Sequence, residues 1–337
     1  RRNSSSSTAV RWHRIASAFM RRAGGFRHIS YVEITMSRLI SATLGRISPR
    51  FRTFDAFVPI YRQSLAARGL AEKTMQNHDV ALRQLSAAIG RDIISGIRPH
   101  KIAVPLRALH LEHPHAAQRM LSEARAAFAE AVALGWTDTN PAMEVKMPVA
   151  KTARARLTLE AWQAIADYAL KNMPPWVHRM LVLALITGLR RGDLARLQFD
   201  DVRDDHLQIC LQKTGALLRL PLALRMDAID MSLEEAIAAC RGYSKGNVFM
   251  LRKSTGAQLS PDSLSARFET AREAVFGKHT GEGAPPSLHE CRSLAERLYR
   301  EQGINTQRLL GHAHQKMTDV YNSERGLTGG QWKTLEL

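Results

Sequence analysis

The chain has 337 residues, a hydrophobic content of 45% and a formal net charge of +17. This length predicts two or three domains with buried cores, and the lack of an apolar run of about 18 residues argues against a membrane span. Three scattered cysteines are too few for a disulfide framework, so a reducing, cytoplasmic setting is expected. The positive charge favours a polyanion as partner.

The positive charge is concentrated at the N-terminus. Residues 1–52 contain 11 arginines, no lysine and a single acid, Glu33, so more than half of the net charge lies in this segment. Its weak periodicity predicts no regular element. A disordered basic tail, a DNA-binding arm, a decayed or altered start and an organellar transit peptide are alternative interpretations.

Residues 53–150 are predicted to form a compact all-helical module. Apolar residues recur at helical spacing over 54–69, 74–89 and 116–134, and a glycine ends each segment. The stretch 110–115 contains three histidines but is broken by Pro114, which favours a solvated loop over a metal site. Residues 146–156 hold four basic residues, a proline and no acid. They suit an interdomain linker, either lying along a phosphate backbone or simply exposed.

Residues 151–337 are predicted to form a mixed α+β domain. Helices are expected at 159–170 and 176–186, the second so apolar that it should be buried. Alternating residues predict strands at 206–212 and 217–222 around a turn at 213–215, and 247–251 is a candidate third strand. Pro285 and Pro286 introduce another helix, with Ser287 and Glu290 expected as a capping box and Gly303 as the stop.

Five residues in this second region form a set suited to attack on a phosphodiester. They occur in the order Arg190, His289, Arg292, His312 and Tyr321, within the motifs T-G-L-R, H-E-C-R and L-L-G-H and the late tyrosine. Arginine offers a planar fork for two phosphate oxygens, and H-x-x-R places both side chains on one helix face. Each motif alone is weak evidence for this chemistry. A tyrosine, for example, is more often a packing residue than a nucleophile. Their order and spacing together are specific.

The chain resembles the tyrosine recombinases of the phage integrase family, and most closely the lambda type of integrase. The resemblance covers about residues 53–337, through 187–197, 213–215, 288–299, 309–312 and 321–332. It implies a core-type DNA-binding domain at 53–150 and a catalytic domain at 151–337. It also implies that the tail near 332–337 packs on a neighbouring subunit. Residues 1–52 occupy the place of the family's arm-binding domain but show no clean alternating strands.

The resemblance also implies residue roles. Tyr321 would be the nucleophile that forms a 3′-phosphotyrosyl link, and Arg190 and Arg292 would clamp the phosphate. His289 and His312 would donate hydrogen bonds or move protons. Two further roles follow: Lys213, at the tip of the expected hairpin, would be the general acid toward the 5′-hydroxyl, and Asp193 would be an acidic support.

No cofactor or metal is implied by this chemistry. The expected partners are double-stranded DNA attachment sites, three further copies in a homotetramer and accessory DNA-bending proteins, in a nucleoid-associated setting. Candidate DNA contacts are the polar and basic residues of the helical module and linker: Lys73, Thr74, Arg119, Lys151, Arg154 and Arg156. Type IB topoisomerase-like relaxation and a catalytically idle DNA-binding prophage remnant are the alternative functions, and a basic nucleoid protein would leave Tyr321 unexplained.

Overall fold

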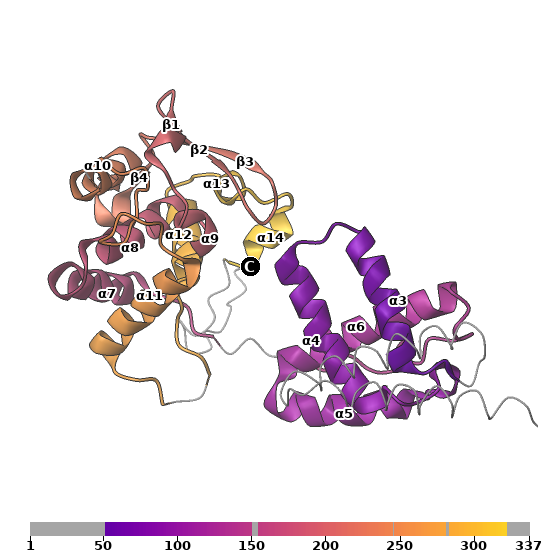
Figure 1. The fold of residues 1–337 in the computed structure, drawn as a ribbon. Helices are drawn as coiled ribbons and strands as arrows, with labels where there is room; N and C mark the ends of the chain where they lie inside the picture. The colour runs from indigo at the N-terminus through magenta and orange to yellow at the C-terminus, as the bar shows by residue number, and fades with distance from the viewer. Residues whose placement is uncertain (1–50, 150–153, 245, 281–282, 322–337) are drawn as a thin grey trace, which may run out of the picture. The chain divides into compact units, whose positions relative to one another are not determined.

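The computed structural model describes residues 51–149, 154–244, 246–280 and 283–321, in two units that divide between Lys151 and Thr152 (Figure 1). The expectations for residues 1–50, for Lys151 and for the tail at 332–337 lie outside the described residues. In the described parts the chain is mostly helical with small sheets. Among the described helices, none is long and apolar enough to cross a membrane.

The described part of the first unit is helical. Its elements are α3 (Phe54–Ala67), α4 (Glu72–Ile89), the short η2 (Ile94–Gly96), α5 (Pro99–Glu112) and α6 (Pro114–Ala133). Thr53 caps α3 by accepting a hydrogen bond from the amide of Ala56. The helices enclose an aromatic core in which the ring of Phe57 lies 5.4 Å from that of Trp136. Three of these α-helices match the predicted ranges to within a few residues.

Helix α5 corrects one prediction. Residues 110–112 are its last residues, and α6 begins at Pro114, so the stretch expected to be a loop is a tight helix–helix junction. Proline at the first position of each helix explains the junction, because that position needs no intrahelical N–H donor. Pro114 therefore starts a helix here and does not break the chain into a loop.

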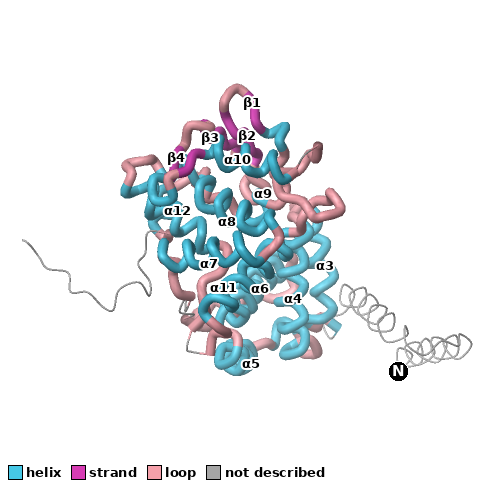
Figure 2. Tube along the Cα trace, turned by 90° about the vertical axis from the view of Figure 1, so that its left-hand side faces the viewer, coloured by secondary structure: helices cyan, strands magenta, loops and turns pink. Residues whose placement is uncertain are grey.

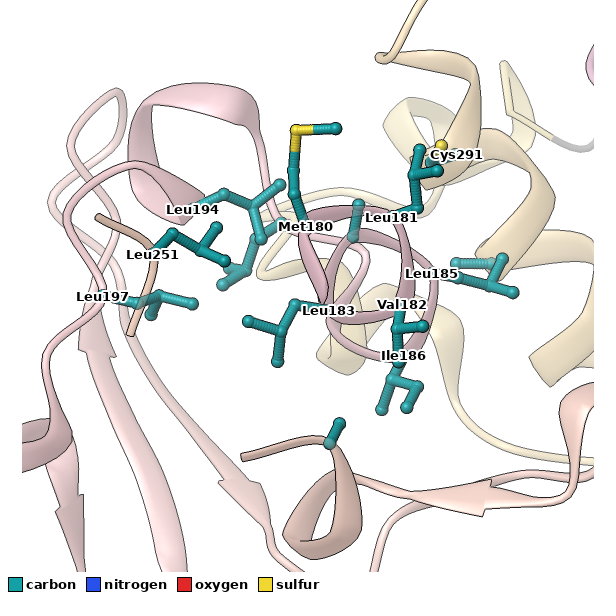
Figure 3. Packing of buried hydrophobic residues seen from close by; sticks show 14 of the residues in the cluster. Met180, Leu181, Val182, Leu183, Leu185, Ile186, Leu194, Leu197, Leu251 and Cys291 are labelled. Atoms are coloured by element: carbon teal, nitrogen blue, oxygen red, sulfur yellow. The ribbon is translucent and has the colours of Figure 1, made fainter. Parts of the chain in front are cut away.

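The second unit is built around α8. Its helices are α7 (Leu159–Asn172), α8 (Pro175–Thr187), α9 (Arg191–Leu194), α10 (Leu233–Tyr243), α11 (Pro261–Phe276), α12 (Glu290–Glu301), α13 (Thr306–Leu310) and α14 (Gln315–Asp319), with η3 (Phe199–Asp201) and η4 (Asp227–Ile229). Helices α7, α10, α11 and α12 contact α8. From Met180 to Ile186 its side chains are buried on every side, as Figure 3 shows. The predicted burial of this helix is thus confirmed.

Two small antiparallel sheets complete the unit, and Figure 2 shows them gathered at one end of it. Their strands are β1 (Val202–Arg203), β2 (His206–Cys210), β3 (Leu217–Pro221), β4 (Arg225–Met226) and β5 (Met231–Ser232). The register of β2 and β3 pairs Leu207 with Leu220 and Ile209 with Leu218. All four side chains are buried, which explains the alternation in the sequence.

The predicted strand at 247–251 is wrong. The segment makes only an isolated bridge between Phe249 and Gln198, and the third strand of the sheet is β1. Asn247 caps its own loop, since its side chain accepts a hydrogen bond from the amide of Phe249 at 2.9 Å. This local bond competes with strand pairing.

The start of α12 also differs from expectation. His289 is the N-cap residue and makes no side-chain capping bond, so Ser287 and Glu290 do not form a capping box. The Ser287 hydroxyl accepts a hydrogen bond from Arg154, and the Glu290 carboxylate pairs with Arg156. The helix ends before Gly303, whose φ of +76° suits the predicted stop.

Candidate active site

Arg292 lies at the centre of the site and is the largest fully buried side chain of the described residues. It projects from α12, and its two terminal nitrogens donate to the carbonyls of Gly188 at 2.6 Å and Leu310 at 2.7 Å. Both carbonyls lie at helix ends, where the last carbonyls lack intrahelical partners. The guanidinium therefore joins the C-terminal ends of α8 and α13. Gly188 and Gly311 close these helices with left-handed backbone conformations.

Arg190 supplies a second guanidinium. It follows α8 and caps the short α9, and its Nη1 atom is buried without a hydrogen-bond partner among the described residues. Neither Arg190 nor Arg292 forms an ion pair with a carboxylate in the described part of the chain. Burial and the charge of Arg190 lower the pKa of Arg292. Two cations this close without a paired carboxylate form a site suited to a bound anion.

His312 is held in a defined tautomer. Its Nε2 atom lies 2.9 Å from Nη2 of Arg292, and its Nδ1 atom lies 2.9 Å from the hydroxyl of Thr318. Because a guanidinium only donates, Nε2 must accept, and the proton is assigned to Nδ1, which donates to Thr318. Burial, followed by the charges of Arg292 and Arg190, lowers the pKa of His312 to about 4. The imidazole is therefore neutral near pH 7.

Tyr321 follows α14 and lies over this cluster. Its hydroxyl is 3.3 Å from Nε2 of His289, its ring stacks on His312 with centroids 5.5 Å apart, and the Arg292 guanidinium lies 5.6 Å from the ring centroid. Desolvation by the surrounding chain and then the charges of nearby arginines lower the pKa of His289, although its side chain keeps access to solvent. A neutral His289 is thus placed beside the tyrosine hydroxyl.

Lys213 is positioned by the hairpin. It is exposed in the turn between β2 and β3, and it is one of the cations that lower the pKa of His289. The buried carboxylate of Asp193 anchors the turn. It accepts hydrogen bonds from the amide of Gln212 at 2.9 Å and from the Arg196 side chain at 3.0 Å. The structure thus brings five of the six predicted catalytic residues into direct proximity or contact, with Lys213 at the rim.

The linker residues separate into different environments. Arg154 is exposed, donates to the Ser287 hydroxyl and also lowers the pKa of His289. Arg156 is only 5% exposed and pairs with Glu290 at 3.1 Å, so its expected role as a DNA contact is corrected to an internal one. The arginine spacing in the sequence could not distinguish the two, because the difference depends on which side chain the fold covers.

The remaining candidate contacts that the structure describes lie on the first unit. Thr74 and Arg119 line a depression of about 390 Å³ between α4 and α6, while the exposed Lys73 bonds Gln76 at 3.3 Å beside it. Sequence reasoning missed the other polar lining residues, which are Asn77, His78, His115, Gln118, Ser122 and Glu123. Their helical spacing was visible in the sequence, but the pairing of the two helix faces was not.

Three residues support the second unit's cluster in roles that the sequence did not indicate. Thr318 fixes His312, Ser293 donates to the Tyr321 carbonyl at 3.0 Å, and Arg156 donates to the Val320 carbonyl at 2.5 Å. Thr318 lies outside the motifs, and although Ser293 and Arg156 lie in stretches that the sequence analysis named, nothing in the sequence indicates these contacts. Within the described residues, no group of three or more His, Cys, Asp or Glu side chains is arranged to hold a metal ion.

Comparisons with known proteins identify the family to which the chain belongs. Residues 155–326 match the model of the phage integrase family. Prophage integrase IntE of Escherichia coli K12 is 34% identical over 302 residues, which cover 87% of this chain and 80% of that protein. A lambda integrase dimer bound to a COC′ core site matches with a TM-score of 0.78 and 28% identity, over 94% of this chain and 91% of that one. A lambda integrase tetramer bound to a Holliday junction matches with a TM-score of 0.77 and 28% identity, over 93% and 91%. The chain therefore belongs to the phage integrase family and is a tyrosine site-specific recombinase.

Proposed function

We propose that Tyr321 is the nucleophile with which this recombinase cuts and rejoins DNA. The observation that carries the assignment is the position of its hydroxyl, 3.3 Å from His289 and above the buried Arg292–His312 pair. Tyr299 offers a contrast, since its hydroxyl is buried and donates to the Ile186 carbonyl. Burial raises the pKa of Tyr299, and its hydroxyl has no such cluster around it.

The phosphate is held by the two guanidiniums. A scissile phosphodiester is an anion, and its transition state carries further charge on the non-bridging oxygens. Arg190 offers a buried Nη1 and Arg292 a buried Nε, neither of which has a partner among the described residues. Donors that are already desolvated and fixed lose little on binding, so they stabilise developing charge efficiently.

The proposed cleavage step exchanges the bond between phosphorus and the 5′-oxygen for a bond between phosphorus and Tyr321. The Tyr321 oxygen attacks phosphorus, its proton passes to the neutral Nε2 of His289, and the bond from phosphorus to the 5′-oxygen breaks. Lys213 gives a proton to that oxygen, so a 5′-hydroxyl leaves and a 3′-phosphotyrosyl link remains. The reverse step uses a 5′-hydroxyl of a partner strand. The link preserves the energy of the original phosphodiester, and no cofactor takes part in the proposed step.

The DNA duplex is proposed to contact the first unit at the depression between α4 and α6. Thr74 and Arg119 supply a hydroxyl and a cation there, and Asn77 and Gln118 supply amides that suit base edges. Lys73 lies next to this surface, and Arg154 offers an exposed cation in the second unit. Arg156 is left out because it is buried.

We further propose that the chain acts as a homotetramer on two DNA attachment sites. The support is the similarity to lambda integrase, which has been solved as a dimer on a core site and as a tetramer on a Holliday junction. A topoisomerase-like activity and an idle remnant are less favoured, because the chain matches integrases along most of its length and its catalytic set is complete.

The test is covalent trapping in EDTA. A pool of nicked duplexes carrying attachment-like sequences is incubated with wild-type protein, Tyr321→Phe and Tyr299→Phe. A protein–DNA band on a denaturing gel is expected with wild type and Tyr299→Phe, and its loss is expected with Tyr321→Phe. A band that persists in Tyr321→Phe, or no band from wild type on DNA that it binds, would contradict the assignment.

A further inference from the structure

The backbone that carries Tyr321 is held from outside its own helix. Helix α14 has only five residues and ends at Asp319, so it is too short to fix the following chain by itself. The side chain of Val320 is 61% exposed and contributes little burial. The two carbonyls next to the nucleophile instead accept side-chain hydrogen bonds, from Arg156 to Val320 at 2.5 Å and from Ser293 to Tyr321 at 3.0 Å.

Arg156 is itself tightly constrained. Its Nη1 atom lies 3.1 Å from Glu290, and the two side chains are only 2% and 6% exposed. Glu290 directly follows His289, whose ring meets the Tyr321 hydroxyl. One guanidinium fork therefore spans from the peptide of Val320 to the beginning of α12. This arrangement fixes the distance between the segment that carries the hydroxyl and the segment that carries its partner histidine.

A second layer of contacts supports the first. Arg297 donates to the carbonyl of Leu157 at 2.6 Å and to the Ser293 hydroxyl at 3.3 Å. Because the Ser293 oxygen accepts from Arg297, its own proton is directed to the Tyr321 carbonyl. Residues 156 and 157, at the end of the linker, are thus tied to α12 and to the nucleophile segment together.

The energetics favour a geometric role for Arg156. A buried ion pair gains little net stability, because the cost of desolvating both charges offsets their attraction. Apolar residues of similar size would serve the core at least as well. The ion pair holds the Arg156 guanidinium in one orientation, in which its Nη2 atom donates to the Val320 carbonyl.

We propose that Arg156 is a positioning residue for strand cleavage, which places Tyr321 by holding the carbonyl of Val320. It does not contact DNA or the reacting atoms. Ser293 and Glu290 complete this anchor, and Ser293 holds the carbonyl of Tyr321. The proposal rests on the assignment of Tyr321 as nucleophile.

The first variant is Arg156→Lys, which keeps a cation for Glu290 but lacks the fork that also reaches Val320. The matched control is Arg225→Lys, an exposed ion-paired arginine of the same unit. The rate of covalent-complex formation is measured at saturating nicked duplex, alongside the dissociation constant for that duplex and the thermal midpoint. Amide exchange of a peptide covering 317–321 is followed on the free protein, since the Tyr321 amide bonds the Thr318 carbonyl only while this segment is closed.

For Arg156→Lys we expect the cleavage rate to fall about tenfold or more, because a small misplacement of a nucleophile has a large effect on rate. Exchange at 317–321 should accelerate, while the dissociation constant and thermal midpoint stay near wild type. Ser293→Ala should change rate and exchange in the same direction. The double variant Arg156→Met with Glu290→Gln removes both buried charges, so it should fold and still cleave slowly.

Unchanged rate and exchange in Arg156→Lys and the double variant would overturn the proposal. So would a loss of rate that is fully accounted for by weaker DNA binding or lower stability. If Tyr321→Phe still forms the covalent complex, the assignment of the nucleophile fails instead. The exchange measurement, which needs no DNA, still decides whether Arg156 holds this segment.

Discussion

The Nη2 atom of Arg292 lies 2.9 Å from the Nε2 atom of His312, and both side chains are buried. Because the guanidinium can only donate, this contact keeps the imidazole neutral and directs its other nitrogen to Thr318. A phosphate held by Arg190 and Arg292 would therefore meet two cations and a neutral, oriented histidine.

Thr318→Val should slow cleavage and reduce stability. Valine keeps the shape of threonine but cannot accept from Nδ1 of His312, so a buried donor is left without a partner at a cost of about 1–3 kcal/mol. We expect the cleavage rate at saturating DNA to fall about tenfold, because the imidazole loses the hydrogen bond that orients its ring. Thr306→Val removes a hydroxyl from another buried threonine, which bonds Glu296, and should cost stability without slowing cleavage. Equal rates in the two variants would contradict this role for Thr318.

Asp193→Ala should loosen the turn that carries Lys213. The buried carboxylate accepts from the amide of Gln212 and from Arg196, and its loss leaves both donors without that acceptor. We expect slower cleavage with nearly unchanged DNA binding, measured by covalent trapping and by titration with the same duplex. The control is Asp262→Ala, which removes an exposed carboxylate paired with Arg191. Similar slowing in the control would show that the effect comes from charge rather than from the anchor.

Gly188→Ala should disturb both the fold and the arginine clamp. The residue has a φ of +59°, and a Cβ atom there would lie 2.8 Å from the Leu310 side chain. The left-handed conformation alone costs about 1–2 kcal/mol for a residue with a Cβ atom. Its carbonyl also accepts from Arg292, so cleavage should slow at temperatures where the variant is folded.

Gly303→Ala is the matched control for this substitution. Gly303 also has a positive φ, +76°, but a Cβ atom there would meet nothing within 4 Å. Urea unfolding should show a loss of stability in both variants, larger for Gly188→Ala, and slower cleavage only in Gly188→Ala. Slow cleavage in both would mean that general destabilisation is responsible.

The stability of the free protein should depend on the ionisation of His312. Its pKa is lowered to about 4 in the folded chain, by burial and by Arg292 and Arg190, from an ordinary value of 6.5. Between these two values the unfolded chain binds more protons than the folded chain, so the free energy of unfolding falls as the pH falls. The contribution is fully present above about pH 6.5 and decreases toward pH 4.

His312→Asn removes this titration. Urea unfolding of wild type and variant at about pH 7 and pH 5 should therefore show a smaller loss on acidification in the variant. His314→Asn is the control, since His314 is exposed and lies two residues further along the chain. Parallel losses in wild type and His312→Asn would show that His312 is not shifted in the folded protein.

Local signals made much of the fold predictable. The apolar pattern of α8, the alternation in β2 and β3, and the glycine stops each depend on residues close together in the chain. Two of the differences from expectation involved partners far along the chain, whereas the helix that starts at Pro114 depends on a local feature. Glu290 was expected to cap α12 but is used by Arg156, 134 residues away, and the segment at 247–251 meets Gln198 in a single bridge.

The sequence by itself pointed to the family, and it supplied the six residues that we propose as the catalytic set, because their types suit phosphate attack and their order and spacing resemble the family's motifs. It could not assign protonation states or positions. Whether His312 is neutral, whether Arg156 is buried and what holds Tyr321 depend on contacts among α8, α12, α13 and the segment after α14. Desolvation and hydrogen-bond direction arise only when these distant segments pack together, and for that reason only the tertiary structure decided them.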